Sequence, residues 1–121
     1  NDVPFGKLRP YLKKWFFAKF SGACSSEIWV LRARQGVDSE FLYYLVQSEL
    51  FLTLTQMSSG SKMPRADWKV IADSDFQLPS LAEQVKVSRL LAGIDQKISK
   101  LAAFSDHMET FKKGLLQQMF V

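Results

Sequence analysis

The sequence predicts an α+β fold, in which a small mixed α/β body over residues 1–78 is followed by one long C-terminal α-helix over residues 79–121. Three observations support this prediction. Short runs rich in aromatic and β-branched residues come first, segments with helical signals follow, and no proline interrupts the chain after Pro79. With 121 residues, 47% of them hydrophobic, the chain can build one packed core and still extend a helical arm.

Three short segments in the first third of the chain are typical of strands. Residues 3–8 and 14–20 are rich in aromatic side chains, and Pro10 separates them because it cannot donate to a continuous ladder. Residues 26–32, with the sequence SEIWVLR, alternate with the period of two that a strand requires. We therefore expect a small sheet rich in aromatic side chains.

Short helices are predicted to follow the strands. Asp38 and Ser48 are favourable N-caps for two helices, the first over residues 39–47 and the second ending near Met57. The serine- and glycine-rich run that comes next breaks the second helix, and residues 67–71 form a third, short helical segment. Strands first and helices afterwards favour an α+β body.

The long helix begins with a capping box, because Ser80 stands three residues before Glu83. Apolar residues then recur at steps of three and four and form one apolar stripe along the helix. The residues of this stripe are Val87, Leu91, Ile94, Ile98, Leu101, Phe104, Met108, Phe111 and Leu115. A helix of roughly forty residues would extend about 60 Å, which is more than a body of this size can cover. Part of the stripe is therefore predicted to contact another helix.

The heptad register of the stripe is interrupted near its middle. Two steps of three residues follow one another there, from Ile98 to Leu101 and from Leu101 to Phe104. Such a break overwinds a coiled coil locally or turns its apolar surface toward a different neighbour. We therefore expect a coiled-coil-like helical spacer that is not straight and uniform along its whole length.

The single cysteine and the hydropathy pattern limit the class of protein. Cys24 has no partner for an internal disulfide, so we expect a buried, small apolar residue in a cytoplasmic protein. No apolar run approaches the roughly 20 residues of a membrane span, and no membrane association is expected. The chain opens on Asn1 and continues directly into the strand-like VPF, from which we expect additional sequence upstream.

Positive charge is concentrated in the first part of the chain. The net charge is +4, yet residues 1–35 alone hold seven basic and two acidic side chains. Two loops, residues 7–14 and residues 58–65 (SSGSKMPR), combine basic groups with turn residues, and such groups can neutralise DNA phosphates. A solvated basic face explains the same composition, and the residues alone leave both interpretations open. Tyr11 and Trp15 are expected to pack in the core, because bases in B-DNA are not exposed for stacking.

The sequence gives little support to an enzyme. His107 is the only histidine, is expected to be a solvated residue of the long helix, and has no partner for a catalytic dyad or a zinc site. The GSK sequence at residues 60–62 lacks the upstream glycine of a phosphate-binding loop. The opening NDVPF resembles a motif of amino-methyltransferases, but Val3 stands where that motif has proline. We therefore expect no cofactor and no metal.

Several motifs together resemble one known family. KLRPYLKK, SGACSSEIWVLR, DSEFLYYLVQS, GSKMPRADW, the LPSLAEQ junction and KKGLLQQMF are similar to the distal part of the specificity subunit of type I restriction-modification enzymes. The junction into the long helix is the most specific of these motifs. The resemblance extends over nearly the whole chain and implies a non-catalytic subunit that selects the DNA sequence.

The resemblance also implies partners. In this family two target-recognition domains each read half of a split double-stranded DNA site, and long helices pack antiparallel as a spacer between them. The helices also dock the methyltransferase (M) subunits, which carry the S-adenosylmethionine chemistry, and the restriction (R) subunits join in the full complex. Residues 1–78 would be the distal part of a recognition domain, and residues 79–121 the spacer helix.

Carried over by position, the resemblance implies that DNA-contacting residues lie in the two basic loops. These candidates are Lys7, Arg9, Tyr11, Lys13, Lys14, Gly60, Ser61, Lys62 and Arg65. The chain departs from the family in length, since the first half of a recognition domain would precede Asn1. An alternative therefore remains: a helix-mediated oligomerisation or decoy fragment that engages partner subunits, or a second copy of itself, without reading DNA.

Overall fold

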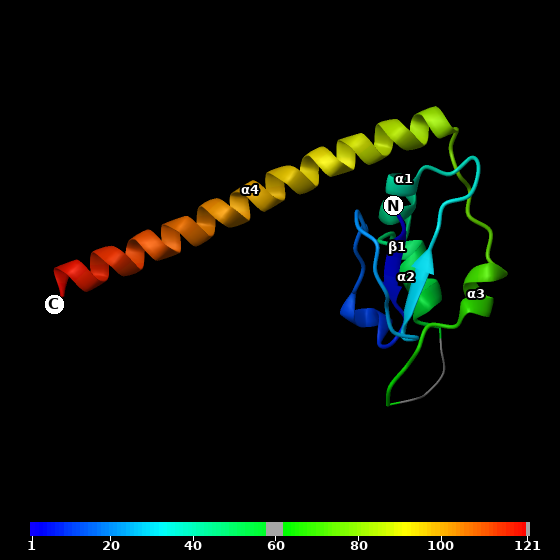
Figure 1. The fold of residues 1–121 in the computed structure, drawn as a ribbon, viewed down its shortest axis with the longest axis horizontal. Helices are drawn as coiled ribbons and strands as arrows, with labels where there is room; N and C mark the ends of the chain where they lie inside the picture. Colours follow the sequence, from blue (N-terminus) through cyan, green and yellow to red (C-terminus); the bar gives the residue numbers. More distant parts are fainter. Residues whose placement is uncertain (58–61, 121) are drawn as a thin grey trace. The chain divides into compact units, whose positions relative to one another are not determined.

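The computed structural model describes residues 1–57 and 62–120 and has the α+β fold predicted from the sequence (Figure 1). The chain forms two compact units, an N-terminal unit (Asn1–Ser88) and a C-terminal unit (Arg89–Val121). The elements in chain order are β1 (Val3–Gly6), the 3-10 helix η1 (Pro10–Leu12), β2 (Ile28–Leu31), α1 (Ser39–Leu45), α2 (Glu49–Thr55), α3 (Trp68–Ala72) and α4 (Leu81–Met119).

Strands β1 and β2 form a two-stranded antiparallel sheet. The register pairs Val3 with Leu31 at one end and Gly6 with Ile28 at the other. Both strands lie within segments predicted to be extended, and both are shorter than predicted. The sheet therefore depends on the surrounding helices to cover its apolar face.

The predicted strand over residues 14–20 is not formed, so this prediction is wrong. The segment lies along the edge of β1 opposite β2, and one isolated bridge joins Phe5 to Trp15. The backbone N–H of Phe16 donates to the carbonyl of Pro4 at 3.3 Å, but Pro4 has no N–H with which to return the bond. The ladder therefore ends after a single bridge.

The short helices follow the predicted caps. Asp38 accepts a hydrogen bond from the N–H of Phe41 at 2.9 Å, and Ser48 accepts one from the N–H of Phe51 at 3.3 Å. Asp67 caps α3 in the same way. These caps satisfy N–H groups that the first turn of a helix leaves without a partner, which fixes where each helix begins.

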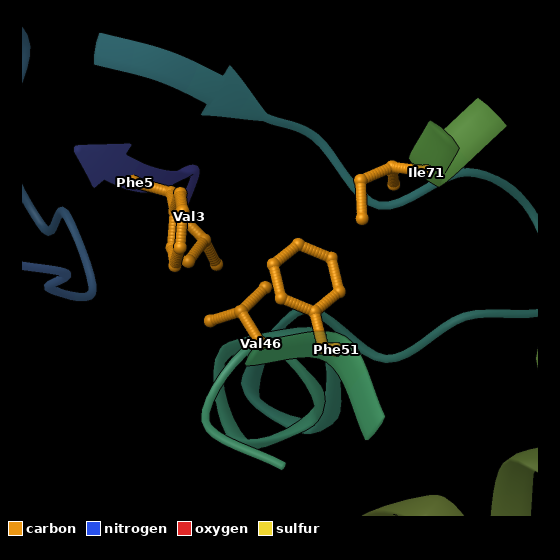
Figure 2. Close-up of a cluster of buried hydrophobic side chains, with 5 residues drawn as sticks. All are labelled: Val3, Phe5, Val46, Phe51 and Ile71. Atoms are coloured by element: carbon orange, nitrogen blue, oxygen red, sulfur yellow. The ribbon is translucent and has the colours of Figure 1, made fainter. Parts of the chain in front are cut away.

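The core of the N-terminal unit is a cluster of five buried side chains from β1, α1–α2 and α3. These are Val3, Phe5, Val46, Phe51 and Ile71 (Figure 2). Phe5 is fully buried, and its ring stacks on Trp15 and Trp29 and meets the edge of the Phe51 ring at a centroid distance of 5.3 Å. Full burial of a phenylalanine contributes about 1.5–3 kcal/mol, so this residue ties the sheet to the helices.

The first turns of α4 belong to the N-terminal unit and are anchored to it by buried polar side chains. Gln84 accepts from the N–H of Asp38 at 2.9 Å and donates to the carbonyls of Gly36 and Pro79, both at 3.0 Å. Ser88 donates to the Asp38 carboxylate at 3.2 Å. The N-cap of α1 and the start of α4 are thus joined by one hydrogen-bond network.

The predicted capping box is present at the start of α4. The Ser80 N–H donates to the Glu83 carboxylate at 3.3 Å, and the Glu83 N–H donates to the Ser80 hydroxyl at 3.4 Å. The helix then continues to Met119 without interruption. His107 is exposed on it, as the sequence predicts.

Two predictions about individual side chains are wrong. Cys24 is exposed rather than buried, because residues 19–26 form an exposed segment without a strand or helix. Tyr11 is half-exposed on η1 instead of entering the core, whereas Trp15 does pack against the core cluster. Within the part of the chain that the structure describes, no helix combines the length and the apolar character needed to cross a bilayer.

Candidate nucleic-acid interface

The fold brings the two predicted basic loops together. The N–H of Arg9 donates to the carbonyl of Pro64 at 2.7 Å, and the N–H of Ala66 donates to the carbonyl of Lys7 at 2.8 Å. These bonds enclose an isolated antiparallel bridge between Leu8 and Arg65. Segments almost sixty residues apart in the sequence therefore form one paired surface, which we call the loop pair (residues 7–14 and 62–66).

The first loop of the pair is held in a compact turn. Arg9 and Lys13 flank η1, and both adopt the left-handed conformation, with φ of 49° and 53°. Such values are uncommon outside glycine and cost of order 1 kcal/mol or more, so surrounding contacts must hold them. The Pro64 contact supplies part of this restraint, and the turn exposes Tyr11 at its tip.

The second loop is fixed to the sheet by an ion pair. The Arg65 Nε lies 3.1 and 3.0 Å from the two carboxylate oxygens of Glu27, and its Nη2 lies 3.0 Å from Oε1. Hydrogen bonding from Arg65 is the main cause that lowers the pKa of Glu27, and the charge of Lys7 lowers it further. Arg65 is therefore partly neutralised, and its clearest role in the structure is to position the loop.

Three of the remaining basic candidates place their positive charge at the surface. Lys13, Lys14 and Lys62 are exposed, and none of them forms an ion pair with another described residue. Arg9 is half-buried, and its Nε has no hydrogen-bond partner within residues 1–57 and 62–120. The candidates Gly60 and Ser61 lie outside the described residues.

The sequence did not predict that Glu27 forms an ion pair with Arg65. The spacing of 38 residues between Glu27 and Arg65 gives no local signal of their pairing. The same holds for Asp2 and Arg32, whose paired hydrogen bonds at 2.9 and 2.8 Å attach the start of β1 to the segment after β2. Glu27 and Arg32 lie in the predicted strand over residues 26–32, but Asp2 and Arg65 lie outside every predicted strand, so the strand pattern does not indicate either pair.

The apolar stripe of α4 is largely uncovered. Its members in the C-terminal unit include Ile98, Leu101 and Phe104, which are 58%, 68% and 62% exposed. Leu91 is half-buried, and the other stripe residues are exposed as well. Contiguous apolar surface of this kind is typical of an interaction surface rather than of a face that stays in water.

The described residues contain no cluster that resembles a metal site. No group of three or more His, Cys, Asp or Glu side chains among residues 1–57 and 62–120 is arranged to hold an ion. In the loop pair, Arg9 and Lys13 stand on either side of the tight turn of η1.

The sequence was compared with models of known protein families and with curated proteins. A family model described as the type I restriction modification DNA specificity domain matches residues 9–103. The chain belongs to this family. The specificity-domain match covers η1, β2, the three short helices and the first part of α4, and therefore includes most of the loop pair and part of the apolar stripe.

Curated relatives agree with the specificity-domain family. The chain is 26% identical over 110 residues to the type I restriction enzyme EcoDI specificity subunit of Escherichia coli, an overlap of 90% of this chain and 23% of that protein. It is 26% identical over 85 residues to the MjaVIII specificity subunit of Methanocaldococcus jannaschii, with 69% of this chain and 20% of that protein covered. It is 27% identical over 89 residues to the MjaIX specificity subunit of the same organism, with 73% and 21% covered. The chain thus spans less than a quarter of the length of these relatives.

Proposed function

We propose that the chain is part of a DNA sequence-recognition subunit of a type I restriction-modification system and contributes to reading one half of a split site. The subunit itself is non-catalytic. Methyltransferase subunits that use S-adenosylmethionine would carry the methyl transfer, and restriction subunits would join the full complex. Residues 1–78 would then be the distal part of a recognition domain, and residues 79–121 its spacer helix.

The observation that best supports this proposal is the loop pair. Its two segments carry the exposed Lys13, Lys14 and Lys62, none of which forms an ion pair with another described residue, within a chain that belongs to the specificity family. Exposed lysines neutralise phosphates and release counterions, which gives affinity and positions a protein on the duplex. Arg65 would contribute indirectly, because its ion pair with Glu27 positions the loop.

Charge reversal tests the loop pair. The double variant Lys13→Glu, Lys62→Glu, in the complex with methyltransferase subunits, is expected to weaken DNA binding roughly tenfold or more. The slope of log K against log salt should fall in magnitude by about 0.9 for each DNA phosphate that the variant no longer neutralises. Fluorescence anisotropy over a salt series measures both quantities.

The matched control places the same charge change elsewhere. Lys86→Glu with Lys113→Glu alters two exposed lysines of α4 and should leave the affinity and the salt slope close to those of the wild type. Arg65 is not reversed, because a glutamate there would repel Glu27 and open the loop pair. Unchanged DNA binding by the Lys13, Lys62 variant would show that these loops do not contact DNA.

We also propose that α4 docks the methyltransferase subunits. The exposed apolar stripe supports this role, and it equally supports the second candidate function, a helix-mediated oligomerisation or decoy fragment that binds partner subunits without reading DNA. The two candidates differ in one respect. A complex that assembles but has no salt-dependent DNA affinity is the result that favours the second.

Assembly has its own test. Ile98→Asp with Leu101→Asp places two charges on the stripe and is expected to abolish co-elution with methyltransferase subunits in size-exclusion chromatography. Gln96→Asp with Ser99→Asp adds the same charge to polar positions of the same helix and should leave assembly intact. If both variants co-elute equally well, the stripe is not the docking surface.

A further inference from the structure

Glu27 contacts both segments of the loop pair. Its main-chain carbonyl accepts a hydrogen bond from the N–H of Lys7 at 3.0 Å, and its carboxylate accepts the Arg65 bonds from the second segment. Its own N–H donates to the Ser25 hydroxyl at 3.3 Å. The main chain and the side chain of one acidic residue are therefore both engaged, and they connect two segments that are distant in the sequence.

The ion pair uses only part of the Arg65 guanidinium. A guanidinium carries five N–H donors, and the bonds to Glu27 come from Nε and Nη2 alone. The N–H groups of Nη1 are not used in these bonds, and 49% of the Arg65 side-chain surface is accessible. After the hydrogen bonds from Arg65, the charge of Lys7 also lowers the pKa of Glu27, so Lys7 lies close to the pair. Two basic side chains and one acidic side chain leave a net positive charge, which still attracts an anion.

An arginine that is already fixed binds a phosphate more tightly than a mobile one. Immobilising a side chain with many rotamers at an interface weakens binding by roughly 2- to 10-fold. The two-atom pairing with Glu27 restrains the Arg65 guanidinium before any DNA binds, so this loss is reduced. The repulsion between the Glu27 carboxylate and a phosphate acts in the opposite direction, but the charge of Arg65 compensates for it and salt screens it at an exposed site.

We propose that Glu27 is a positioning residue for DNA binding, which holds Arg65 so that the N–H groups of Nη1 donate to a DNA phosphate. The inference rests on the proposed function of the loop pair, and it adds a direct phosphate contact to the part that Arg65 plays in positioning its loop. It also assigns a favourable role to an acidic residue. Charge alone predicts the reverse, since a carboxylate repels phosphates.

Removal of the carboxylate separates the two explanations. Glu27→Ala leaves the main-chain groups of this residue in place and is expected, in the complex with methyltransferase subunits, to weaken DNA binding roughly 2- to 10-fold. The slope of log K against log salt should fall in magnitude by about 0.9, the value for one lost phosphate contact. A variant that is only less stable would not change this slope, because its folded molecules keep every contact. Asp2→Ala is the matched control, since it breaks the ion pair with Arg32 outside the loop pair, and it should not weaken binding.

Arg65→Lys shows whether Glu27 acts through the guanidinium. Lysine keeps the positive charge but offers no second nitrogen, so Glu27→Ala should not weaken binding further in this background. Tighter or unchanged binding by Glu27→Ala, an unchanged salt slope, or the same loss of affinity in both backgrounds would each overturn the inference. If Lys13→Glu with Lys62→Glu weakens binding in the same assay while Glu27→Ala does not, only the inference fails. If the charge reversal has no effect either, the proposed function fails as well.

Discussion

Arg65 donates from its Nε and Nη2 to the Glu27 carboxylate, which leaves the other N–H groups of its guanidinium as the ones that could meet a phosphate. Both side chains are partly exposed, with 49% and 36% of the side-chain surface of Arg65 and Glu27 accessible, and ion pairs at such sites are screened by water. The pair therefore matters less as a source of stability than as a geometric restraint. It joins the loop before α3 to the residue that precedes β2.

The pH dependence of stability should reveal this pair. Arg65 lowers the pKa of Glu27 from its ordinary 4.5, so the pair stabilises the fold above pH 4.5 and loses this contribution as the pH falls through the lowered value. In urea titrations, the advantage of the wild type over Glu27→Gln is expected to be constant well above pH 4.5 and to shrink below it. Glu109→Gln, which removes an exposed carboxylate with no ion pair to any described residue, should show no comparable trend. A difference independent of pH down to the most acidic sample would contradict the pairing.

At the level of secondary-structure elements, two separate sets of hydrogen bonds define where α4 begins. The capping box of Ser80 and Glu83 satisfies local N–H groups, whereas Gln84 and Ser88 connect the helix to Asp38, the N-cap of α1. The second set is buried, with Gln84 only 1% exposed. Buried polar side chains of this kind stabilise a fold only while all partners remain bonded.

Truncation of Gln84 tests the anchor. Gln84→Ala leaves the Asp38 N–H and the carbonyls of Gly36 and Pro79 without their bonds, and is expected to lower the free energy of unfolding by about 1–3 kcal/mol. Gln96→Ala, at an exposed position of the same helix, should change it by no more than about 0.5 kcal/mol. Urea unfolding followed by tryptophan fluorescence measures the difference. Equal effects of the two variants would mean that the anchor contributes nothing.

At the scale of the whole molecule, the buried core and most of the exposed apolar stripe belong to different units. The buried aromatic core lies in the N-terminal unit, while the exposed apolar stripe extends through the C-terminal unit. A body of 88 residues has a free energy of unfolding of roughly 4–13 kcal/mol, so it depends on a few well-packed side chains.

Phe5→Ala is expected to remove a large part of that stability. Deleting a buried phenylalanine costs about 3–5 kcal/mol, and here it also removes the ring on which Trp15 and Trp29 stack. Thermal unfolding followed by near-ultraviolet circular dichroism should show an early loss of aromatic signal. The control Phe20→Ala alters a ring that is 71% exposed and should cost no more than about 0.5 kcal/mol. A small effect at Phe5 would show that the core is organised around another residue.

Features that depend on neighbours within a few residues follow from the amino-acid sequence alone. The α+β class, the caps at Asp38 and Ser48, the capping box and the long helix follow from local hydrogen bonding and from helical period, and the structure confirms them. The apolar pattern of the stripe is likewise a property of the chain alone, because a continuous helix converts spacing directly into position on a face.

Contacts between residues far apart in the sequence could be known only from the folded chain. Only the folded chain placed Arg9 against Pro64 and Glu27 against Arg65, and so joined two basic loops into one surface. Residues 14–20 do not form a strand, because they lie along the side of β1 on which Pro4 has no N–H that could donate to them. Local sequence patterns cannot predict such contacts, because each contact depends on which donor and acceptor the fold brings together.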